Sequence, residues 1–329
     1  MKFLLIDFGA SFIKGVLYDK EKKEFSNEQI IISPFSKKDI VSKEQIKNKI
    51  SELLIKYFSW GKNYDIDYIF TCSIIGGFYK DEKYYTWKCA ERPSIPDTPQ
   101  CLISGIVDNK ILHKSHSKVF NLQGTDKIEC IGKICNIPVL TSISDTYSAL
   151  KSVNLDNNMI INLGTGSQVF YFNKSQSYIP SGRSLLHINN FFKQLNSNLD
   201  IFEDMQKLNL ESVLNGSLKI NLNFFKQNYN YKEGGSIELI NDNFNYCNFI
   251  SSLLKSYIEQ YFEFIEDYLK NKNASKNIFL LGGIPKKNKL IKEYFEYKFP
   301  QCNFIINEKA VDTHLGLAKI IDNENISYG

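Results

Sequence analysis

Two stretches of the chain share one pattern of hydrophobic and small residues. Residues 3–18 contain an apolar run, a Gly-Ala-Ser turn and a second apolar run, and residues 159–172 repeat this pattern around Gly, Thr, Gly and Ser. Apolar runs of this length joined by small residues predict two β-hairpins. Aligned on their turns, the hairpins pair four positions: Asp7 with Asn162, Gly9 with Gly164, Ala10 with Thr165, and Ser11 with Gly166. The repeat indicates that the chain consists of two related halves.

Strands and helices alternate through the remainder of the chain. The expected strands cover residues 67–75, 138–144, 277–284 and 302–307. The expected helices cover residues 43–58, 125–134, 145–153, 201–208, 211–216, 248–271, 286–297 and 313–321. This alternation predicts α/β layers. A chain of 329 residues is long enough for two domains, and the second hairpin sets them at residues 1–150 and 151–329.

Composition narrows the class of protein. Hydrophobic residues make up 43% and charged residues 23% of the chain, as in a globular protein, and no segment is apolar for long enough to span a bilayer. The net charge of +4 is not gathered into a basic stripe, so neither nucleic acid nor a membrane is expected as a partner. Seven scattered cysteines without a C-x-x-C pair disfavour a disulfide framework or a zinc site. With an N-terminal apolar run too short for a signal peptide, these features predict a cytoplasmic protein.

The two hairpin turns are candidate phosphate-binding loops. Without a Cβ, glycine lets backbone N–H groups approach an anion closely. For either turn alone, ordinary hairpin geometry is the simpler interpretation, but two matching copies favour a clamp that holds a polyphosphate from both halves. Gly282 and Gly283 follow an apolar strand, where the backbone can pass close to a flat base or simply turn into a helix. Asp145 opens a predicted helix, either as an N-cap or as a reactive carboxylate.

In this order the motifs resemble those of the ASKHA superfamily, which includes sugar kinases, hexokinase, actin and the Hsp70 ATPase domain. The matching segments are residues 4–19 and 161–172 for the two phosphate motifs, 277–291 for the adenosine motif, and 311–321 for the closing helix. The FGGY carbohydrate kinases are the most similar members, because there too an Asp opens a helix shortly before the second phosphate loop. Residues 179–190 are similar to a stretch of sedoheptulokinase-like members. The resemblance implies an α/β fold of two ribonuclease H-like (actin-like ATPase) domains around a nucleotide cleft.

The same resemblance implies an ATP-dependent carbohydrate kinase that uses Mg²⁺. Asp145 becomes the candidate catalytic base, and Asp7 the residue that holds Mg²⁺ through water. The candidate nucleotide-binding residues are Gly9, Ala10, Ser11, Lys14, Gly164, Thr165, Gly166, Ser167, Gly282 and Gly283. Asn162 stands where ATP-hydrolysing relatives carry Asp, which favours transfer to an alcohol over the action of a phosphohydrolase or an activating ATPase.

The acceptor side departs from the family pattern. The chain is shorter than the family norm, and TWKCAERP at 86–93 stands where the family has Trp-x-Asp-x-Arg. Trp87, Arg92 and Asp145 are the candidate substrate-binding residues for a sugar or polyol, with a heptulose or another ketose among the candidates. The chain is also a candidate homodimer. The alternative is a nucleotide-binding regulatory protein that keeps the scaffold without sugar kinase activity.

Overall fold

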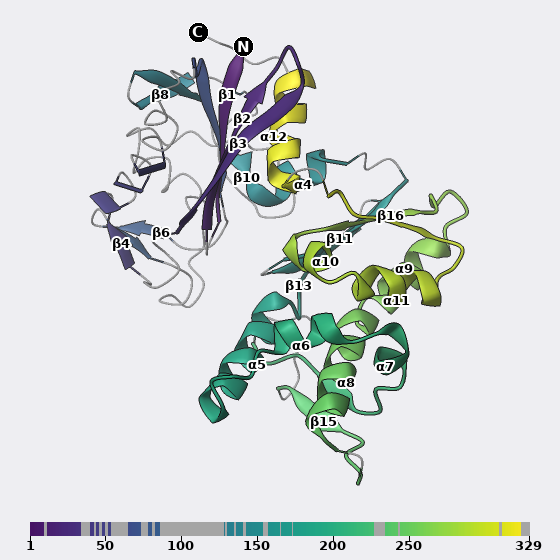
Figure 1. Ribbon diagram of the computed structural model, residues 1–329. Coiled ribbons are helices and arrows are strands. Elements are labelled where there is room, and N and C mark those ends of the chain that lie inside the picture. Colours follow the sequence, from purple (N-terminus) through teal and green to yellow (C-terminus); the bar gives the residue numbers. More distant parts are fainter. Residues whose placement is uncertain are drawn as a thin grey trace. The chain divides into compact units, whose positions relative to one another are not determined.

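The chain folds into two compact units. A computed structural model describes residues 1–9, 12–33, 40–42, 44–45, 48–49, 52–53, 65–73, 78–80, 83–85, 128, 130–134, 136–140, 143–153, 157–164, 166–172, 174–226, 234–242, 244–308 and 311–323. Unit 1 comprises Met1–Val153 and Ala310–Gly329, and unit 2 comprises Asn154–Lys309 (Figure 1).

The last helix returns to unit 1. This helix, α12 (Asp312–Asn323), was expected in the C-terminal half, 151–329. Its buried Leu317, Ile320 and Ile321 belong instead to the core that contains Phe3 and Phe70. The apolar face of α12 therefore assigns it to the first sheet, although it lies at the far end of the sequence.

A seven-stranded sheet forms the centre of unit 1. Its strands are β1 (Lys2–Phe8), β2 (Phe12–Asp19), β3 (Glu24–Ile32), β5 (Tyr68–Ser73), β8 (Cys130–Ile134), β9 (Ile137–Leu140) and β10 (Ile143–Ser144). The order is β3-β2-β1-β5-β9-β8, with β10 beside β5. Because β1 and β10 both run parallel to β5, their carboxyl ends lie at one edge of the sheet. The strands β4 (Ile40–Ser42), β6 (Phe78–Lys80) and β7 (Lys83–Tyr85) form a separate small sheet.

Unit 2 repeats the central part of this arrangement. Its strands are β11 (Met159–Leu163), β12 (Ser167–Tyr171), β13 (Lys174–Ile179), β16 (Asn277–Leu281) and β17 (Asn303–Ile305), in the order β13-β12-β11-β16-β17. As in unit 1, the first strand pairs antiparallel with its hairpin partner and parallel with the strand on its other side. The repeat that the two hairpins predicted is thus present in the topology of both sheets.

Helices account for most of the rest of unit 2. They are α5 (Gly182–Leu195), α6 (Ile201–Lys207), α7 (Leu210–Leu214), α8 (Tyr246–Glu259), α9 (Phe262–Leu269), α10 (Gly283–Lys287) and α11 (Leu290–Lys298), with a two-stranded sheet of β14 (Lys219–Asn221) and β15 (Ser236–Glu238). In unit 1, α4 (Asp145–Lys151) follows β10 directly. Among the described residues no helix has both the length and the hydropathy needed to cross a membrane.

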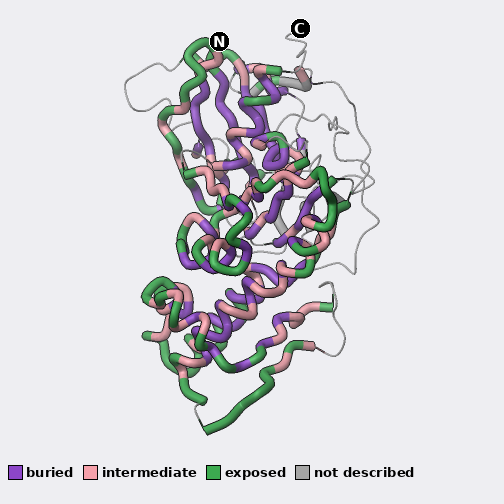
Figure 2. The backbone as a smooth tube through the Cα atoms, turned by 90° about the vertical axis from the view of Figure 1, so that its right-hand side faces the viewer, coloured by how far each residue is buried: buried purple, intermediate pink, exposed green. Residues whose placement is uncertain are grey.

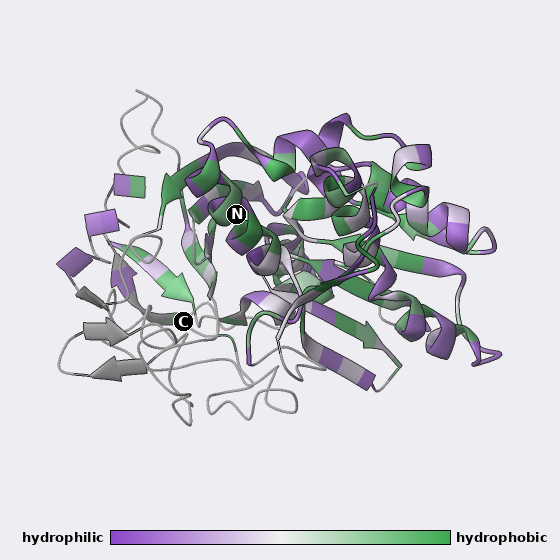
Figure 3. Ribbon diagram, turned by 90° about the horizontal axis from the view of Figure 1, so that it is seen from below, coloured by the Kyte–Doolittle hydropathy of each residue, from purple (hydrophilic) through white to green (hydrophobic). Residues whose placement is uncertain are grey.

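The central strands carry the buried positions of each unit. In β1, every residue from Phe3 to Phe8 is buried, and β11 is buried at four of its five positions. Figure 2 shows this buried backbone in purple, and Figure 3 shows hydrophobic residues on the strands and hydrophilic residues on many of the outer turns. Such near-continuous burial is typical of strands that are covered on both faces.

Two element predictions were wrong. Residues 125–134 were expected as a helix, but Cys130–Ile134 forms strand β8, antiparallel to β9. A Gly in the middle of that segment disfavours a helix, and the register with β9 gives its backbone groups partners. The single helix expected over 248–271 is two helices, α8 and α9, and the side chain of Gln260 between them donates to the carbonyl oxygens of Pro180 and Tyr257.

Candidate active site

Two carboxylates lie at the carboxyl edge of the sheet in unit 1. Asp7 is the next-to-last residue of β1, and Asp145 follows β10 as the first residue of α4. Since β1 and β10 flank β5 in parallel, strands from distant parts of the sequence bring these side chains to one edge. Asp7 is buried, with 7% of its surface exposed, whereas Asp145 keeps intermediate exposure. The two carboxylates therefore differ in their exposure to solvent.

The environment of Asp145 makes its carboxyl group a weaker acid. Burial of the carboxyl, and after it the negative charge of Asp7, raise the pKa of Asp145 from 3.8 to about 7. Hydrogen bonds from the N–H group and the hydroxyl of Thr146, at 2.6 and 3.2 Å from Oδ1, lower the pKa but do not offset these causes. A carboxyl with a pKa near the working pH is suited to accept a proton in one step and release it in the next.

Asp7 is held by two donors from the described residues. The Thr313 hydroxyl donates to Oδ2 at 3.0 Å, and the Cys72 thiol lies 3.8 Å from Oδ1. Burial, and then the charges of Asp7 and Asp145, raise the pKa of Cys72, so the thiol stays protonated and can donate. Each carboxylate oxygen of Asp7 offers further lone pairs.

This donor set fits a hydrated magnesium ion. Mg²⁺ prefers hard oxygen ligands and keeps several of its waters, so one or two carboxylates are enough when phosphate oxygens supply the rest. Asp7 provides such an oxygen. No group of three or more potential His, Cys, Asp or Glu ligands occurs in the described part of the chain.

The first hairpin turn needs glycine at position 9. The Gly9 N–H group donates to the carbonyl oxygen of Phe12 at 3.0 Å, and a Cβ on Gly9 would lie 2.8 Å from that oxygen. Ala10 and Ser11 lie outside the described residues.

Lys14 is the direct cross-strand neighbour of Asp7 and is partly buried. Directly opposite residues of an antiparallel pair extend from the same face of the sheet, so Lys14 lies on the face of Asp7.

The second hairpin turn is an open loop with a buried end. The Gly164 N–H group donates to the carbonyl oxygen of Gly166 at 3.2 Å, and Gly166 is exposed with open space where a Cβ would be. Ser167 is 1% exposed, so its hydroxyl faces the interior of unit 2 and only its backbone remains for an anion. Thr165 lies outside the described residues, and Asn162 before the loop is partly exposed.

Three segments of unit 2 meet at this loop. The N–H group of Gly182, the first residue of α5, donates to the Gly164 carbonyl oxygen at 3.1 Å, and a Cβ on Gly182 would lie 2.8 Å from that oxygen and from Ile284 Cδ1. Gly282 has φ +94°, and a Cβ there would lie 2.5 Å from the Leu163 carbonyl oxygen. Glycines thus bring the loop, the start of α5 and the start of α10 into backbone contact.

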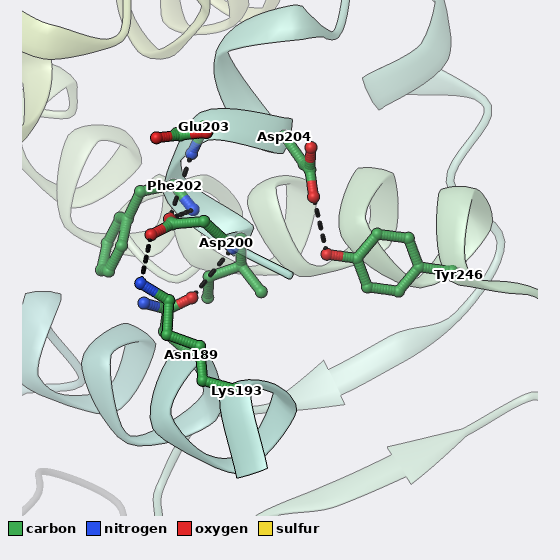
Figure 4. Close-up of polar contacts among 8 residues, drawn as sticks. Asn189, Lys193, Asp200, Phe202, Glu203, Asp204 and Tyr246 are labelled. Atoms are coloured by element: carbon green, nitrogen blue, oxygen red, sulfur yellow. Dashed lines mark hydrogen bonds and ion pairs between the residues drawn. The ribbon is translucent and has the colours of Figure 1, made fainter. Parts of the chain in front are cut away.

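The far half of α5 is fixed by polar contacts with α6. The Asn189 side chain accepts from the Ile201 N–H group at 2.9 Å, and Lys193 pairs with Asp200 at 2.6 Å (Figure 4). Asp204 on α6 accepts from the Tyr246 hydroxyl at 2.8 Å, which connects α6 to α8 (Figure 4). These contacts hold α5, whose first residue contacts the Gly164 loop, against the other helices of unit 2.

Several site residues were missed from the sequence. Thr313 and His314 open α12, and Gly182 opens α5. The order Pro-Ser-Gly before an apolar periodic run at 184–192 is a helix-start signal that could have indicated Gly182. For Thr313 the sequence offers no signal, because its partner is at the opposite end of the chain. Trp87 and Arg92 lie outside the described residues.

No protein-family model and no curated protein sequence matches the chain. Solved structures do match it. The gluconate kinase from Lactobacillus acidophilus aligns over 98% of this chain and 89% of that chain, with 11% identity and a TM-score of 0.68. The ligand-bound xylulose kinase from the same organism aligns over 98% and 90%, with 13% identity and a TM-score of 0.66. The glycerol kinase from Plasmodium falciparum with ADP aligns over 96% and 88%, with 13% identity and a TM-score of 0.58.

These matches establish the class of fold. The chain has the two-domain α/β fold of the actin-like ATPases, and a xylulose kinase, a gluconate kinase and a glycerol kinase are among its structural neighbours. At these identities the likeness shows the fold alone, so the function has to be argued from the residues of the site.

Proposed function

We propose that the protein is an ATP-dependent carbohydrate kinase, which transfers the γ-phosphoryl group of ATP to a hydroxyl group of a sugar or polyol. The observation that carries the proposal is the pair of carboxylates in unit 1. One is buried beside hydrogen-bond donors, and the other is partly exposed and has a pKa raised to about 7. The fold shared with sugar kinases supports the same reaction class.

Asp145 is the proposed general base. Its ionised carboxylate accepts the proton of the acceptor hydroxyl as the new bond forms between that oxygen and the γ-phosphorus. The bond between the γ-phosphorus and the bridging oxygen breaks, and ADP leaves with the bonding electron pair. The proton on Asp145 then passes to solvent. A raised pKa favours this role, because a carboxylate with the ordinary Asp pKa of 3.8 would hold the proton only weakly.

Asp7 is the proposed contact to Mg²⁺ through water, and Lys14 is a proposed phosphate contact on the same face of the sheet. When bound, the ion neutralises charge on the phosphate oxygens. The contribution of the chain is to hold a carboxylate at the end of β1, in a fixed orientation, between Thr313 and Cys72.

Unit 2 is the proposed nucleotide site. Gly164, Thr165, Gly166 and the backbone of Ser167 would bind phosphate, and Gly282 and Gly283 would lie against the adenosine. The open space at Gly166 and Gly283 supports close backbone approach at those two positions. Gly9, Ala10 and Ser11 would supply the corresponding loop of unit 1.

The proposed acceptor is a sugar or polyol, with a ketose such as a heptulose among the candidates. Trp87 and Arg92 are the proposed contacts to it, together with Asp145. An alcohol acceptor is supported by Asn162, since a hydrolytic enzyme would need a group that positions attacking water. Two candidate functions, a carbohydrate kinase and a nucleotide-binding regulatory protein, can therefore be distinguished by experiment.

The test is a search for a phosphorylated product. Wild-type protein is incubated with MgATP and pooled ketoses, aldoses, heptoses and polyols, and products are identified by mass spectrometry. Asp145→Asn is run beside it, with Asp267→Asn as the matched control, because Asp267 pairs with Tyr171 and Lys174 at the surface of unit 2. We expect a sugar phosphate whose rate of formation falls roughly 10²- to 10⁴-fold in Asp145→Asn and is unchanged in the control. ATP binding without product from any acceptor would favour the regulatory protein.

A further inference from the structure

The first turn of α12 contacts both elements that carry the two carboxylates. The Thr313 hydroxyl donates to Asp7 at 3.0 Å, and the Thr313 backbone carbonyl accepts from the Ser148 hydroxyl of α4 at 2.6 Å. Ser148 follows Asp145 by almost one helical turn. We propose that Thr313 is a positioning residue, which orients the Asp7 carboxylate towards Mg²⁺ and holds it in register with the helix that carries Asp145. This inference rests on the proposed function.

The hydroxyl of Thr313 is the stronger of the donors to Asp7 in the described residues. A thiol is a weak donor, and the Cys72 contact is 3.8 Å long. A buried carboxylate that loses its better donor is left in an environment that solvates it poorly. Its free lone pairs would then no longer be held in one direction. Outer residues of this kind orient metal-binding groups, and their loss typically weakens metal binding by roughly 10- to 100-fold.

The backbone of Thr313 is anchored independently of its side chain. Ser148 is fully buried, and α12 approaches α4 so closely that Gly316 has no room for a Cβ against the Ser148 carbonyl oxygen. The next residue, His314, is buried and its Nε2 lies 3.3 Å from the carbonyl oxygen of Lys14 on β2. These contacts fix the main chain of Thr313 in place, so the side-chain oxygen can be removed without releasing the helix.

The charge of the surroundings agrees with this role. Burial lowers the pKa of His314 to about 4, against the opposing effect of Asp7, so the ring is neutral at pH 7. A neutral ring can donate to the Lys14 carbonyl oxygen without pairing with Asp7. The Thr313 hydroxyl and the Cys72 thiol are thus the donors to Asp7 in the described part of the chain, and both are neutral groups.

Two substitutions at one position separate positioning from packing. Thr313→Val keeps the shape of the side chain and removes the hydroxyl, whereas Thr313→Ser keeps the hydroxyl and removes the methyl group. Ser152→Ala is the matched control, since it deletes a buried hydroxyl directly after the end of α4, which donates to the Ala149 carbonyl oxygen and not to Asp7 or Asp145. Two quantities are measured for wild type and each variant. The first is the dissociation constant of Mn²⁺ in the presence of a non-hydrolysable ATP analogue, from electron paramagnetic resonance. The second is the kcat and KM of the phosphoryl-transfer reaction.

We expect Thr313→Val to bind Mn²⁺ roughly tenfold or more weakly and to lose kcat by a similar factor, with the KM of the acceptor little changed. Thr313→Ser should stay within about threefold of wild type, and Ser152→Ala should equal it. Equal Mn²⁺ binding by wild type and Thr313→Val would overturn the inference, and so would a Thr313→Ser protein as defective as Thr313→Val. Absence of Mn²⁺ binding by wild type would overturn it as well. If wild type binds Mn²⁺ but phosphorylates nothing, the kinase proposal fails while the Mn²⁺ comparison still decides the role of Thr313.

Discussion

Gly316 of α12 lies directly against the backbone carbonyl of Ser148 on α4, with no space for a side chain between the two helices. One of these helices starts with Asp145, and the first turn of the other contacts Asp7 through Thr313. The crossing therefore connects the helix that carries Asp145 to the residue that donates to Asp7. Residues from the middle and from the end of the chain meet here because both helices pack against β5.

A side chain at position 316 should destabilise unit 1. The Cβ of Gly316→Ala would overlap the Ser148 carbonyl, which belongs to the backbone and cannot rotate away. We expect a loss of about 1–3 kcal/mol in the free energy of unfolding, measured by urea titration. Gly283→Ala is the control, since nothing lies within 4 Å of its new Cβ. Equal stability of Gly316→Ala and wild type would show that α4 and α12 do not cross as closely as described.

The rate of phosphoryl transfer should depend on the protonation of Asp145. A general base acts only in its ionised form, and burial beside Asp7 raises the pKa of this carboxyl to about 7. The kcat/KM for the acceptor should therefore be constant well above pH 7 and fall about tenfold per pH unit well below it. In Asp145→Asn the residual rate should lose this dependence. A wild-type profile that stays flat from pH 5.5 to 8.5 would exclude Asp145 as the base.

The same carboxyl should make stability depend on pH. The pKa of Asp145 is 3.8 in the unfolded chain and about 7 in the folded protein. The contribution of this carboxyl to the free energy of unfolding is therefore fully present below about pH 4 and is lost as the pH rises through 7. Asn is neutral throughout. Asp145→Asn should thus exceed wild type in unfolding free energy at pH 8, by roughly 1–3 kcal/mol once partial exposure is discounted, and match it near pH 4. Thermal unfolding at both pH values measures the difference, and a variant less stable than wild type at pH 8 would assign Asp145 a capping role instead.

Substitution of Gly164 should impair nucleotide binding without unfolding unit 2. A Cβ at Gly164 would meet the Gly166 carbonyl oxygen at 3.4 Å, which is an ordinary contact, while the methyl groups of Gly164→Val would fill the loop. We expect weaker MgATP binding in calorimetry with a nearly unchanged melting temperature.

Gly282→Ala serves as the contrasting variant. Its positive φ and a Cβ 2.5 Å from the Leu163 carbonyl oxygen should lower the melting temperature as well. Undiminished MgATP affinity in Gly164→Val would remove the phosphate role of this loop.

Much of the fold could be predicted because its signals are local. The two hairpins, the strand at 67–75 and the helix that opens at Asp145 each appear as a contiguous apolar pattern, and all are present as β1–β2, β11–β12, β5 and α4. The strand β8 was missed because Cys130–Ile134 forms a strand only through its pairing with β9. At the break between α8 and α9, the side chain of Gln260 donates to the carbonyl oxygen of Pro180, a contact between residues that are distant in the sequence.

The candidate site was predictable only in part for the same reason. Asp7, Asp145 and the glycines are recognisable by the turns and helix starts that surround them. The raised pKa of Asp145 depends on burial and on the charge of Asp7, neither of which the sequence states. Thr313 and Gly316 acquire a role only when α12 returns to unit 1, so no local pattern could single them out.

The most direct test of the kinase proposal follows the γ-phosphoryl group of ATP labelled at that position. Wild-type protein, Mg²⁺, labelled ATP and the pooled sugars and polyols are incubated, and the label is separated into ATP, inorganic phosphate and organic phosphate. A kinase should place most of the released label in organic phosphate, and Asp145→Asn should lose that fraction. Label that appears only in inorganic phosphate, or that stays in ATP with every acceptor, would contradict the proposal that this protein is a carbohydrate kinase.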